Sequence, residues 1–232
     1  MLALALPLMI SMGSWSVMLF VDRTLLLWHS PEAISAALPA GCLYWAVTSF
    51  ALGTTGYVST FVAQYYGASQ PRRIGAVVWQ GLWIGIISIP LYMLLLPVAP
   101  LIFRSSGHDP AVANEEIAYF SVLLWSAGAN VVAASQAGFF SGRGYTRVVM
   151  IVDIRAVALN IVLDALLIHG LLGLPRLGMV GAGIATVIAI WLKVLAFGWL
   201  MRSDETWRGC YLGSTWAIDW QLMRRLLLYG AP

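Results

Sequence analysis

Long apolar stretches separated by short polar segments run along the whole chain. A membrane-spanning helix needs roughly 20 consecutive apolar residues, and stretches of that length recur throughout. Strands of a membrane barrel would instead alternate over about ten residues, a pattern that the sequence lacks. The chain is therefore predicted to be an all-α polytopic membrane protein. We expect complete spans at residues 2–28, 35–66, 75–103, 116–141, 148–168 and 179–201, and a seventh that begins near Gln221.

The order of the spans suggests a division of the chain. We expect a six-helix lobe at 1–201, a cytoplasmic linker at 202–220 and the start of a second lobe at 221–232. The terminal "LLLYGAP" is similar to "ALALP" near the start, as expected if Pro232 opens a second copy of the repeat. We expect about six further apolar spans after Pro232, so that the chain is a fragment. The alternative is that two such chains pair.

Composition and charge agree with a membrane protein. Of the 232 residues, 60% are hydrophobic and 10% charged, whereas soluble domains carry about 25% charged residues. Lys and Arg accumulate in cytoplasmic loops, so we expect a cytoplasmic amino terminus, a location in the inner membrane and contact with membrane lipid. The net charge of +3 reflects this asymmetry, and no nucleic-acid partner is expected. The basic side carries Arg72, Arg73, Arg143, Arg147, Arg202, Arg208, Arg224 and Arg225, and the other side Arg104 and Arg176.

Motifs of soluble enzymes are missing from the sequence. It has no phosphate-binding glycine-rich loop with its Lys, no HExxH, no GxSxG and no paired CxxC. The stretches "GRGYTR" and "GASQPRR" are better interpreted as tight turns between helices than as anion-binding loops. The sequence therefore gives no support for an enzymatic function.

Ionisable residues inside the spans are the main functional signal. Each costs at least ~2.5 to 3.5 kcal/mol at mid-bilayer, so such residues usually face a protein interior or a water-filled pathway. Asn160 and Asp164 lie one helical turn apart on one face, and no cationic residue stands three or four positions from Asp164. The pair indicates half of a cation-binding site. The alternative is a protonated Asp164 that hydrogen-bonds to another helix.

Three further charged residues lie inside the spans, and the sequence leaves their roles open. Asp153 and Arg155 lie near the cytoplasmic end of the fifth span, where pairing with a neighbouring helix or snorkelling is the simplest account. Lys193, deep in the sixth span, either pairs with an acidic group or snorkels.

Polar residues also form a stripe along each of the first two spans, at spacings of three and four residues. Two polar stripes in an apolar chain imply an internal cavity, although a Ser or Thr can instead bond the carbonyl of the preceding turn. The stripes are Ser11, Ser14, Met18 and Asp22, and Tyr44, Thr48, Thr55 and Ser59. The residues that we expect to line the cavity are Ser14, Met18, Tyr44, Thr48, Thr55 and Asn130.

Polar residues of three different spans are expected at a similar depth in the membrane. Counted from the predicted outer ends, Asp22, Asn160, Asp164 and Thr186 lie roughly 6 to 12 Å inside the membrane at 1.5 Å per residue. Oxygen ligands at one level suit protons or hard cations. These four residues are therefore the predicted cation- or proton-binding site.

The sequence resembles the amino-terminal half of a multidrug and toxic compound extrusion (MATE) transporter, closest to the DNA-damage-inducible protein F branch. Five stretches carry the resemblance, in the family's order, and the last is the most specific. They are "LPLMISMGSWSVMLFVDRTLLLW", "AALPAG", "VAQYYGASQPRRIG", "FFSGRGYTR" and "LNIVLDALLIHGLLGLPRLGMVGAGIATVIA".

The resemblance implies a fold and a function. Family members have twelve helices in two lobes and expel organic cations in exchange for protons or sodium, without an organic cofactor. The implied partners are small amphipathic drug-like substrates and a second lobe, missing here. The resemblance also implies the coupling-ion role of the four residues above, with Na⁺ as the candidate metal ion there. It implies helix bending at Pro7 as well, for which the alternative is a helix-entry residue near the inner interface. Arg23 departs from the family, which more often has a small or hydroxyl residue after this Asp.

Two other functions remain as alternatives. A lipid-linked oligosaccharide flippase of the same superfamily would share the helix pattern, but its cavity should be strongly basic, whereas the predicted cavity residues are acidic and hydroxylic. An inactive membrane fragment would need no convergent acids inside the membrane.

Overall fold

A computed structural model describes residues 2–173, 175–205, 208 and 216–230. Its described part is helical and contains no strand. Five segments are long and apolar enough to cross a membrane, namely 5–29, 31–67, 71–93, 110–142 and 178–203. The helices are α1 (Leu2–His29), α2 (Pro31–Gly56), α3 (Val58–Gly67), α4 (Pro71–Met93), α5 (Ala99–Ser105), α6 (Pro110–Gly142), α7 (Thr146–His169), the short 3₁₀ helix η1 (Leu171–Gly173), α8 (Gly178–Ser203) and α10 (Trp220–Gly230).

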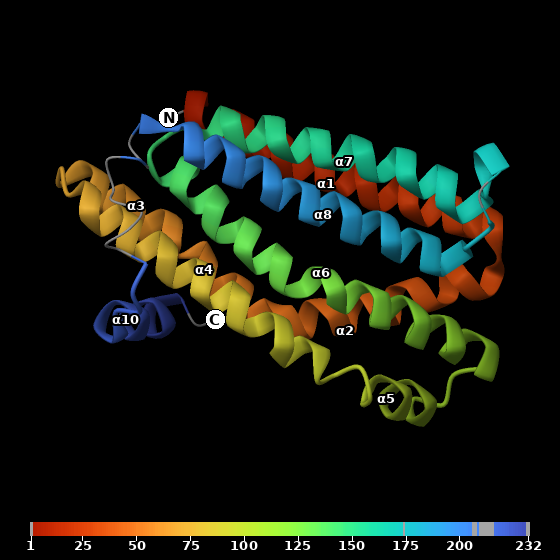
Figure 1. Cartoon of the computed structure of the whole chain (residues 1–232). Coiled ribbons are helices and arrows are strands. Elements are labelled where there is room, and N and C mark those ends of the chain that lie inside the picture. Colours follow the sequence, from red (N-terminus) through yellow and green to blue (C-terminus); the bar gives the residue numbers. More distant parts are fainter. Residues whose placement is uncertain (1, 174, 206–207, 209–215, 231–232) are drawn as a thin grey trace.

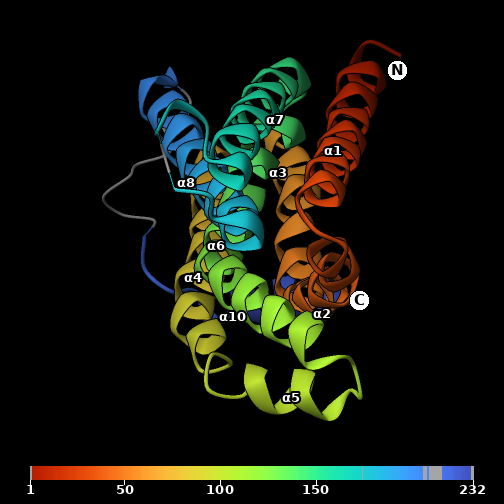
Figure 2. The same cartoon turned by 90° about the vertical axis from the view of Figure 1, so that its right-hand side faces the viewer.

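The predicted all-α membrane fold is confirmed, with the helices arranged in two groups. Helices α1, α7 and α8 lie together along one side, and α2, α3 and α4 along the other (Figures 1 and 2). The 33-residue α6 joins the groups, because it packs against α2 and α4 as well as α8. Helix α7 is long enough to cross a membrane, but four charged residues lower its apolar character.

The third predicted span, 75–103, is wrong as a single helix. Helix α4 ends at Met93, and α5 begins as a separate helix at Ala99. Pro97 and Pro100 explain the break, because a proline supplies no backbone N–H and disfavours helical geometry at the residue before it. Hydropathy continues across the break, so the apolar pattern alone conceals it.

The second span also differs from its prediction. It starts at Pro31 instead of residue 35, and Ser30 caps it by accepting a hydrogen bond from the Ala33 backbone N–H at 3.0 Å. Helix α2 stops at Gly56, where glycine lowers helix stability, and α3 resumes after Tyr57. The combined segment of 37 residues is roughly 55 Å long, so it reaches beyond a hydrocarbon core of about 30 Å.

The last described helix lies against the lobe. Helix α10 begins one residue before the predicted start, and its 11 residues extend roughly 16 Å, about half of a bilayer core. It packs on α2 and α4. The buried Gln80 of α4 fixes the segment before it, donating to the Ala217 carbonyl at 3.1 Å and accepting from the Asp219 N–H at 3.2 Å. The linker prediction falls partly on residues outside the described ranges, as does Pro232.

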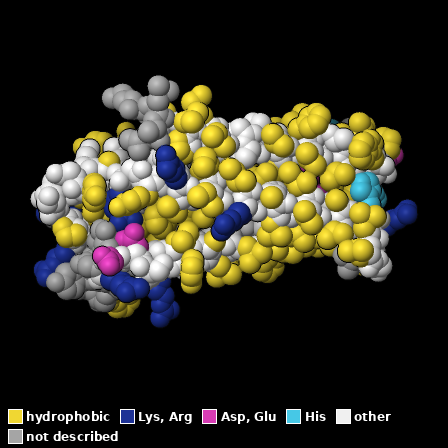
Figure 3. Space-filling view, turned by 90° about the horizontal axis from the view of Figure 1, so that it is seen from above, with side chains coloured by type: hydrophobic (Ala, Val, Ile, Leu, Met, Phe, Trp, Pro, Cys, Tyr) yellow, Lys and Arg dark blue, Asp and Glu magenta, His cyan; other side chains and the backbone are white. Residues whose placement is uncertain are grey.

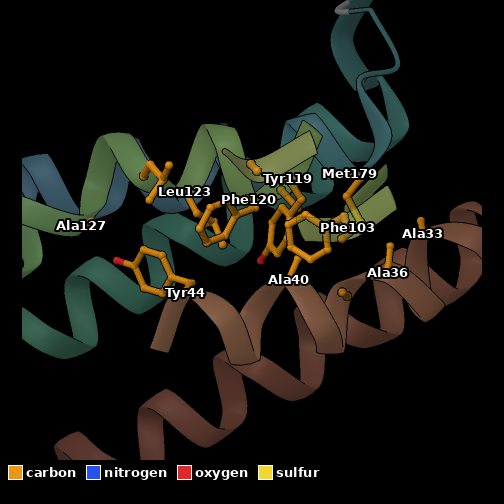
Figure 4. Close-up of a cluster of buried hydrophobic side chains, with 14 of the residues drawn as sticks. Ala33, Ala36, Ala40, Tyr44, Phe103, Tyr119, Phe120, Leu123, Ala127 and Met179 are labelled. Atoms are coloured by element: carbon orange, nitrogen blue, oxygen red, sulfur yellow. The ribbon is translucent and has the colours of Figure 1, made fainter. Parts of the chain in front are cut away.

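An aromatic and alanine-rich core joins α2 to α6. Phe103 of α5 meets Phe120 of α6 edge-on, with ring centroids 5.6 Å apart. Figure 4 shows this cluster between the two helices, with Met179 of α8 at one end. The alanines of α2 give the bulky rings of α6 room to approach its backbone.

Small residues bring α4 and α6 into close contact. A Cβ added at Gly85 would lie 2.8 Å from the Val132 backbone nitrogen, and one at Gly128 would lie 3.0 Å from the Gly85 carbonyl oxygen. The Ser135 hydroxyl donates to the Val78 carbonyl across the same interface, at 3.0 Å. Close backbone approach through glycine is typical of membrane helices, whose association gains little from the hydrophobic effect.

The surface of the lobe is apolar over most of its length, with Lys and Arg gathered mainly toward one end (Figure 3). This is the end where α1 begins. Arg72 and Arg73 lie in the first turn of α4, Arg147 lies in the first turn of α7, and Arg143 lies in the turn between α6 and α7. We call it the basic end and the other the opposite end.

Substitution Gly85→Ala tests the α4–α6 contact. The added methyl group meets backbone atoms of α6 that cannot move aside, so we expect a loss of stability of about 1 to 3 kcal/mol, as for other overpacked interfaces. Apparent unfolding temperature in detergent measures it. Gly13→Ala is the matched control, since a Cβ there meets nothing within 4 Å. Equal unfolding temperatures for both variants would contradict this account.

Candidate cation site and cavity

Asn160 and Asp164 of α7 are both buried, each 1% exposed. In the amide orientation that satisfies both neighbours, Asn160 donates to Asp164 Oδ2 at 3.0 Å and accepts from the Thr186 backbone N–H at 3.2 Å. The amide therefore bridges α7 to α8 and fixes one carboxylate oxygen. The other, Asp164 Oδ1, is buried and has no hydrogen-bond partner among the described groups.

Asp22 of α1 supplies a second buried carboxylate close to the first. It is 6% exposed, and its Oδ1 also lacks a hydrogen-bond partner in the described part of the chain. The charges of Asp22 and Asp164 lie close enough to interact, and Tyr119 of α6 lies within reach of both. Neither carboxylate forms an ion pair among the described residues, although the positive charge of the neighbouring Arg23 acts on Asp22. One guanidinium cannot compensate two carboxylates, so the pair can take up a further cation or a proton.

The predicted common level agrees with the helix ends. Asp22, Asn160, Asp164 and Thr186 lie five to nine residues from the opposite-end termini of α1, α7 and α8, roughly 8 to 14 Å. Three helices thus bring oxygen atoms together at one depth.

A small cavity of about 50 Å³ adjoins these residues. Asp22, Asn160 and Thr186 line it, while Asp164 lies behind Asn160 and is not among its lining residues. The space exceeds what one water molecule needs, so an ion or a water could contact Asp22. Arg23 also lines the cavity, and its buried Nη1 has no hydrogen-bond partner among the described groups.

A larger cavity of about 470 Å³ continues toward the basic end between α1, α7 and α8. It shares Asn160 and Thr186 with the small cavity, so the two spaces adjoin. Its remaining wall is largely apolar and aromatic. The lining residues include Met12, Trp15, Met18, Trp45, Val157, Ala189 and Ile190.

Among the residues expected to line a cavity, two lie elsewhere. Thr48 and Thr55 are fully buried, and their hydroxyls donate to the carbonyls of Tyr44 and Ala51 on their own helix, at 2.8 and 2.9 Å. This is the backbone bonding that competes with a cavity role. The residues that do line one of the two cavities are Ser14, Met18, Tyr44 and Asn130.

Several lining residues escaped the sequence-based prediction. Trp15 packs edge-on against Trp45 of α2, with centroids 5.5 Å apart. The spacing of Ser11, Trp15 and Met18 puts the tryptophan on the predicted polar stripe, so the signal was available. Tyr119 gives no such signal, because it is one aromatic residue in an apolar helix. Pro7 lies inside the continuous α1, and bending there stays a prediction.

The oxygen ligands of the predicted site suit a proton or a small hard cation. Within the described ranges, no group of three or more His, Cys, Asp or Glu side chains is arranged to hold a metal ion. Two carboxylates with an amide and a hydroxyl instead offer hard oxygen ligands, which suit a proton or a Group 1 or 2 cation.

A helical lobe with buried, incompletely compensated carboxylates beside a cavity is typical of integral membrane transport proteins. The family model described as MatE matches residues 7–166, and the chain belongs to this family of transporters. The family predicted from the sequence is thereby confirmed.

Curated relatives and solved structures are similar over the whole chain. It is 32% identical to the probable multidrug resistance protein NorM of Bradyrhizobium diazoefficiens, covering 100% of this chain and 50% of the relative. Multidrug resistance protein MdtK of Klebsiella pneumoniae is 26% identical, with 100% and 51% covered. A MOP superfamily transporter from Pyrococcus furiosus superposes with a TM-score of 0.89 at 24% identity, over 99% of this chain and 50% of that chain.

The coverage and identity of these matches also limit what they show about this chain. The chain spans about half the length of the curated relatives it matches. At 24% identity the solved structure shows the fold. The relatives reported above are NorM and MdtK proteins, so the finer resemblance to the DNA-damage-inducible protein F branch stays an expectation.

Substitution Asn160→Ala tests the bridge between α7 and α8. It leaves Asp164 Oδ2 without its donor, and an unsatisfied buried polar group costs about 1 to 3 kcal/mol. The Thr186 N–H loses a contact across to α7 but keeps its bond within α8. We expect a lower unfolding temperature in detergent. Thr55→Val is the control, because it removes a hydroxyl that bonds only its own helix. An Asn160→Ala variant as stable as Thr55→Val would show that the bridge contributes nothing.

Proposed function

We propose that this chain forms one lobe of a secondary active transporter that exchanges protons or sodium ions for amphipathic organic cations across the cytoplasmic membrane. The observation that carries the proposal is the pair Asp22 and Asp164, two buried carboxylates on different helices, each with an unpartnered oxygen and no ion pair among the described residues. A buried charge without compensation is costly, so these groups bind a cation or take up a proton.

The adjoining cavity supports the choice of cargo. Ligand sites of about 300 to 1,000 Å³ with mainly apolar and aromatic walls suit drug-sized molecules, and the larger cavity has this size and lining. The matched relatives are named multidrug resistance proteins. A flippase for lipid-linked oligosaccharides would need a strongly basic cavity for its anionic carrier. In the larger cavity Lys193 is paired with a carboxylate, and Arg23 is the one basic residue in the described part of the chain that lines the small cavity.

In the proposed cycle, a proton or sodium ion enters from the opposite end and neutralises Asp22 and Asp164. Neutralisation removes the repulsion between the carboxylates, α1 shifts toward α7 and α8, and the cavity loses room for its substrate. Because related transporters bind substrate between two repeats and the relatives are about twice this length, this lobe is proposed to act facing a second one.

Substitution Asp164→Asn tests the coupling role. It removes a titratable group while keeping the volume and most of the hydrogen bonding, so we expect normal folding. Ethidium efflux driven by an imposed proton or sodium gradient should fall at least about tenfold, the equivalent of ~1.4 kcal/mol. Efflux is measured in membrane vesicles from cells that express the native gene, with Asp22→Asn alongside.

The matched control is Asp109→Asn at the N-terminus of α6, where the Asp109 side chain accepts from the Ala111 N–H and Asn caps equally well. Its efflux should equal that of wild type. Undiminished gradient-driven efflux in Asp164→Asn would instead identify this residue as a protonated, structural hydrogen-bonding group. Comparing the two imposed gradients separates proton from sodium coupling.

The proposed orientation places the basic end in the cytoplasm. In a variant whose native cysteines are Ser, a Cys at Asp109 should react with a membrane-impermeant maleimide in intact cells. A Cys at Gln70, in the exposed turn before α4, should react only after the cells are permeabilised. Labelling with the reverse sidedness would overturn the orientation.

A further inference from the structure

A second polar cluster crosses the wall of the larger cavity. Lys193 of α8 pairs with Asp153 of α7, with Nζ and Oδ1 2.6 Å apart. The other oxygen, Asp153 Oδ2, accepts a hydrogen bond from the Ser11 hydroxyl of α1. All three residues line the cavity of about 470 Å³. One carboxylate therefore joins three helices at a cavity surface.

This cluster is separate from the cation site. Asp153 lies eleven residues before Asp164 on α7, roughly 16 Å along the helix axis, toward the basic end. The proposed coupling by Asp22 and Asp164 does not use it. Among the residues that line the larger cavity, Asp153 and Lys193 carry the charges, since the others are apolar, aromatic, hydroxyl or amide side chains.

The ion pair is partly accessible. The side chains of Lys193 and Asp153 are 23% and 15% exposed, so a molecule in the cavity can reach them. An intramembrane ion pair exacts a large desolvation cost, and removing one partner leaves the other charge uncompensated. A positively charged molecule that took the place of the ammonium would keep Asp153 neutralised and avoid that cost.

The Lys193 side chain has a second position open to it, away from Asp153. Its side chain also lines an adjoining space of about 200 Å³ between α7 and α8, which Trp199 and Leu200 help to form. Its ammonium lies 6.0 Å from the centroid of the Phe197 ring, one turn further along α8, where a cation–π contact compensates part of the charge. The four-carbon stem of Lys makes such a swing possible without movement of the helix.

We propose that Asp153 recognises the positive charge of the substrate and that Lys193 is a tethered cation that neutralises Asp153 while the cavity is empty. The ligand class is an amphipathic aromatic monocation whose rings contact Trp15 and Trp45. This proposal deepens the proposed transport function and rests on it. Lys193 competes with such a cation, so weakly cationic or neutral molecules of the same shape do not displace it.

Binding titrations on the purified protein, expressed from its native gene, test the exchange. We expect Lys193→Met to tighten ethidium binding and Asp153→Asn to weaken it, each by about tenfold, because one change removes the competitor and the other the carboxylate. Binding of N-phenyl-1-naphthylamine, a neutral aromatic probe, should stay as in wild type. Opposite signs distinguish recognition from a structural ion pair, whose loss from either side would change binding in the same direction.

Two further variants serve as controls. Arg155→Met removes a positive charge next to the 200 Å³ space but not from the larger cavity, and it should leave ethidium binding unchanged. The double variant Asp153→Asn/Lys193→Met removes both charges together and is well tolerated by comparison with breaking a buried pair. It should bind ethidium as weakly as Asp153→Asn, even if Lys193→Met alone fails to fold.

The outcomes separate this inference from the transport proposal. Ethidium affinities that are equal in wild type, Asp153→Asn and the double variant would overturn the role of Asp153, while the efflux assay with Asp164→Asn would still decide the transport function. Vesicles that export no ethidium under either gradient would overturn the transport function, and the exchange at Asp153 with it.

Discussion

The lack of water in a bilayer core is the constraint on which the rest of this structure depends. Every polar group there needs a partner inside the protein. Helices satisfy the backbone, buried threonines such as Thr48 bond their own helix, and Ser135 bonds across to α4. Against this background a buried polar atom without a partner is informative. Asp22 Oδ1 and Asp164 Oδ1 are two such atoms in the described part of the chain, and the residues around them adjoin a cavity.

The same three helices meet at two levels with different charge balance. Toward the opposite end, α1, α7 and α8 bring together two carboxylates, an amide and a hydroxyl, and Arg23 is the one cationic residue among those described that lines the small cavity there, which leaves an excess of negative charge. Toward the basic end they bring together Ser11, Asp153 and Lys193, where one carboxylate is matched by one ammonium. Excess negative charge suits uptake of a small ion, whereas a matched pair suits exchange of one cation for another. The two proposed roles follow from this difference.

Much of the fold could be predicted from the sequence, because membrane spans are encoded locally in the length of apolar runs. The break between α4 and α5 could not be predicted from hydropathy, since Pro97 and Pro100 interrupt the helix without interrupting the apolar run. Within the site, the face shared by Asn160 and Asp164 follows from helical spacing alone. The pairing of Lys193 with Asp153 does not follow from helical spacing. It depends on how α7 and α8 rotate against each other, which only packing decides.

Helix α1 is the element through which the two levels can communicate. It is the least buried of the five candidate spans, so moving it disrupts little apolar packing, and it contributes Asp22 at one level and Ser11 at the other. Pro7 lies between Ser11 and the start of the helix and lacks the N–H that would hold the preceding turn. In the proposed cycle, neutralisation of Asp22 moves α1, and the same movement alters the Ser11 bond that holds Asp153 in place. Ion uptake at one depth thereby changes how firmly the substrate charge is held about 16 Å away, without a direct contact between the two cations.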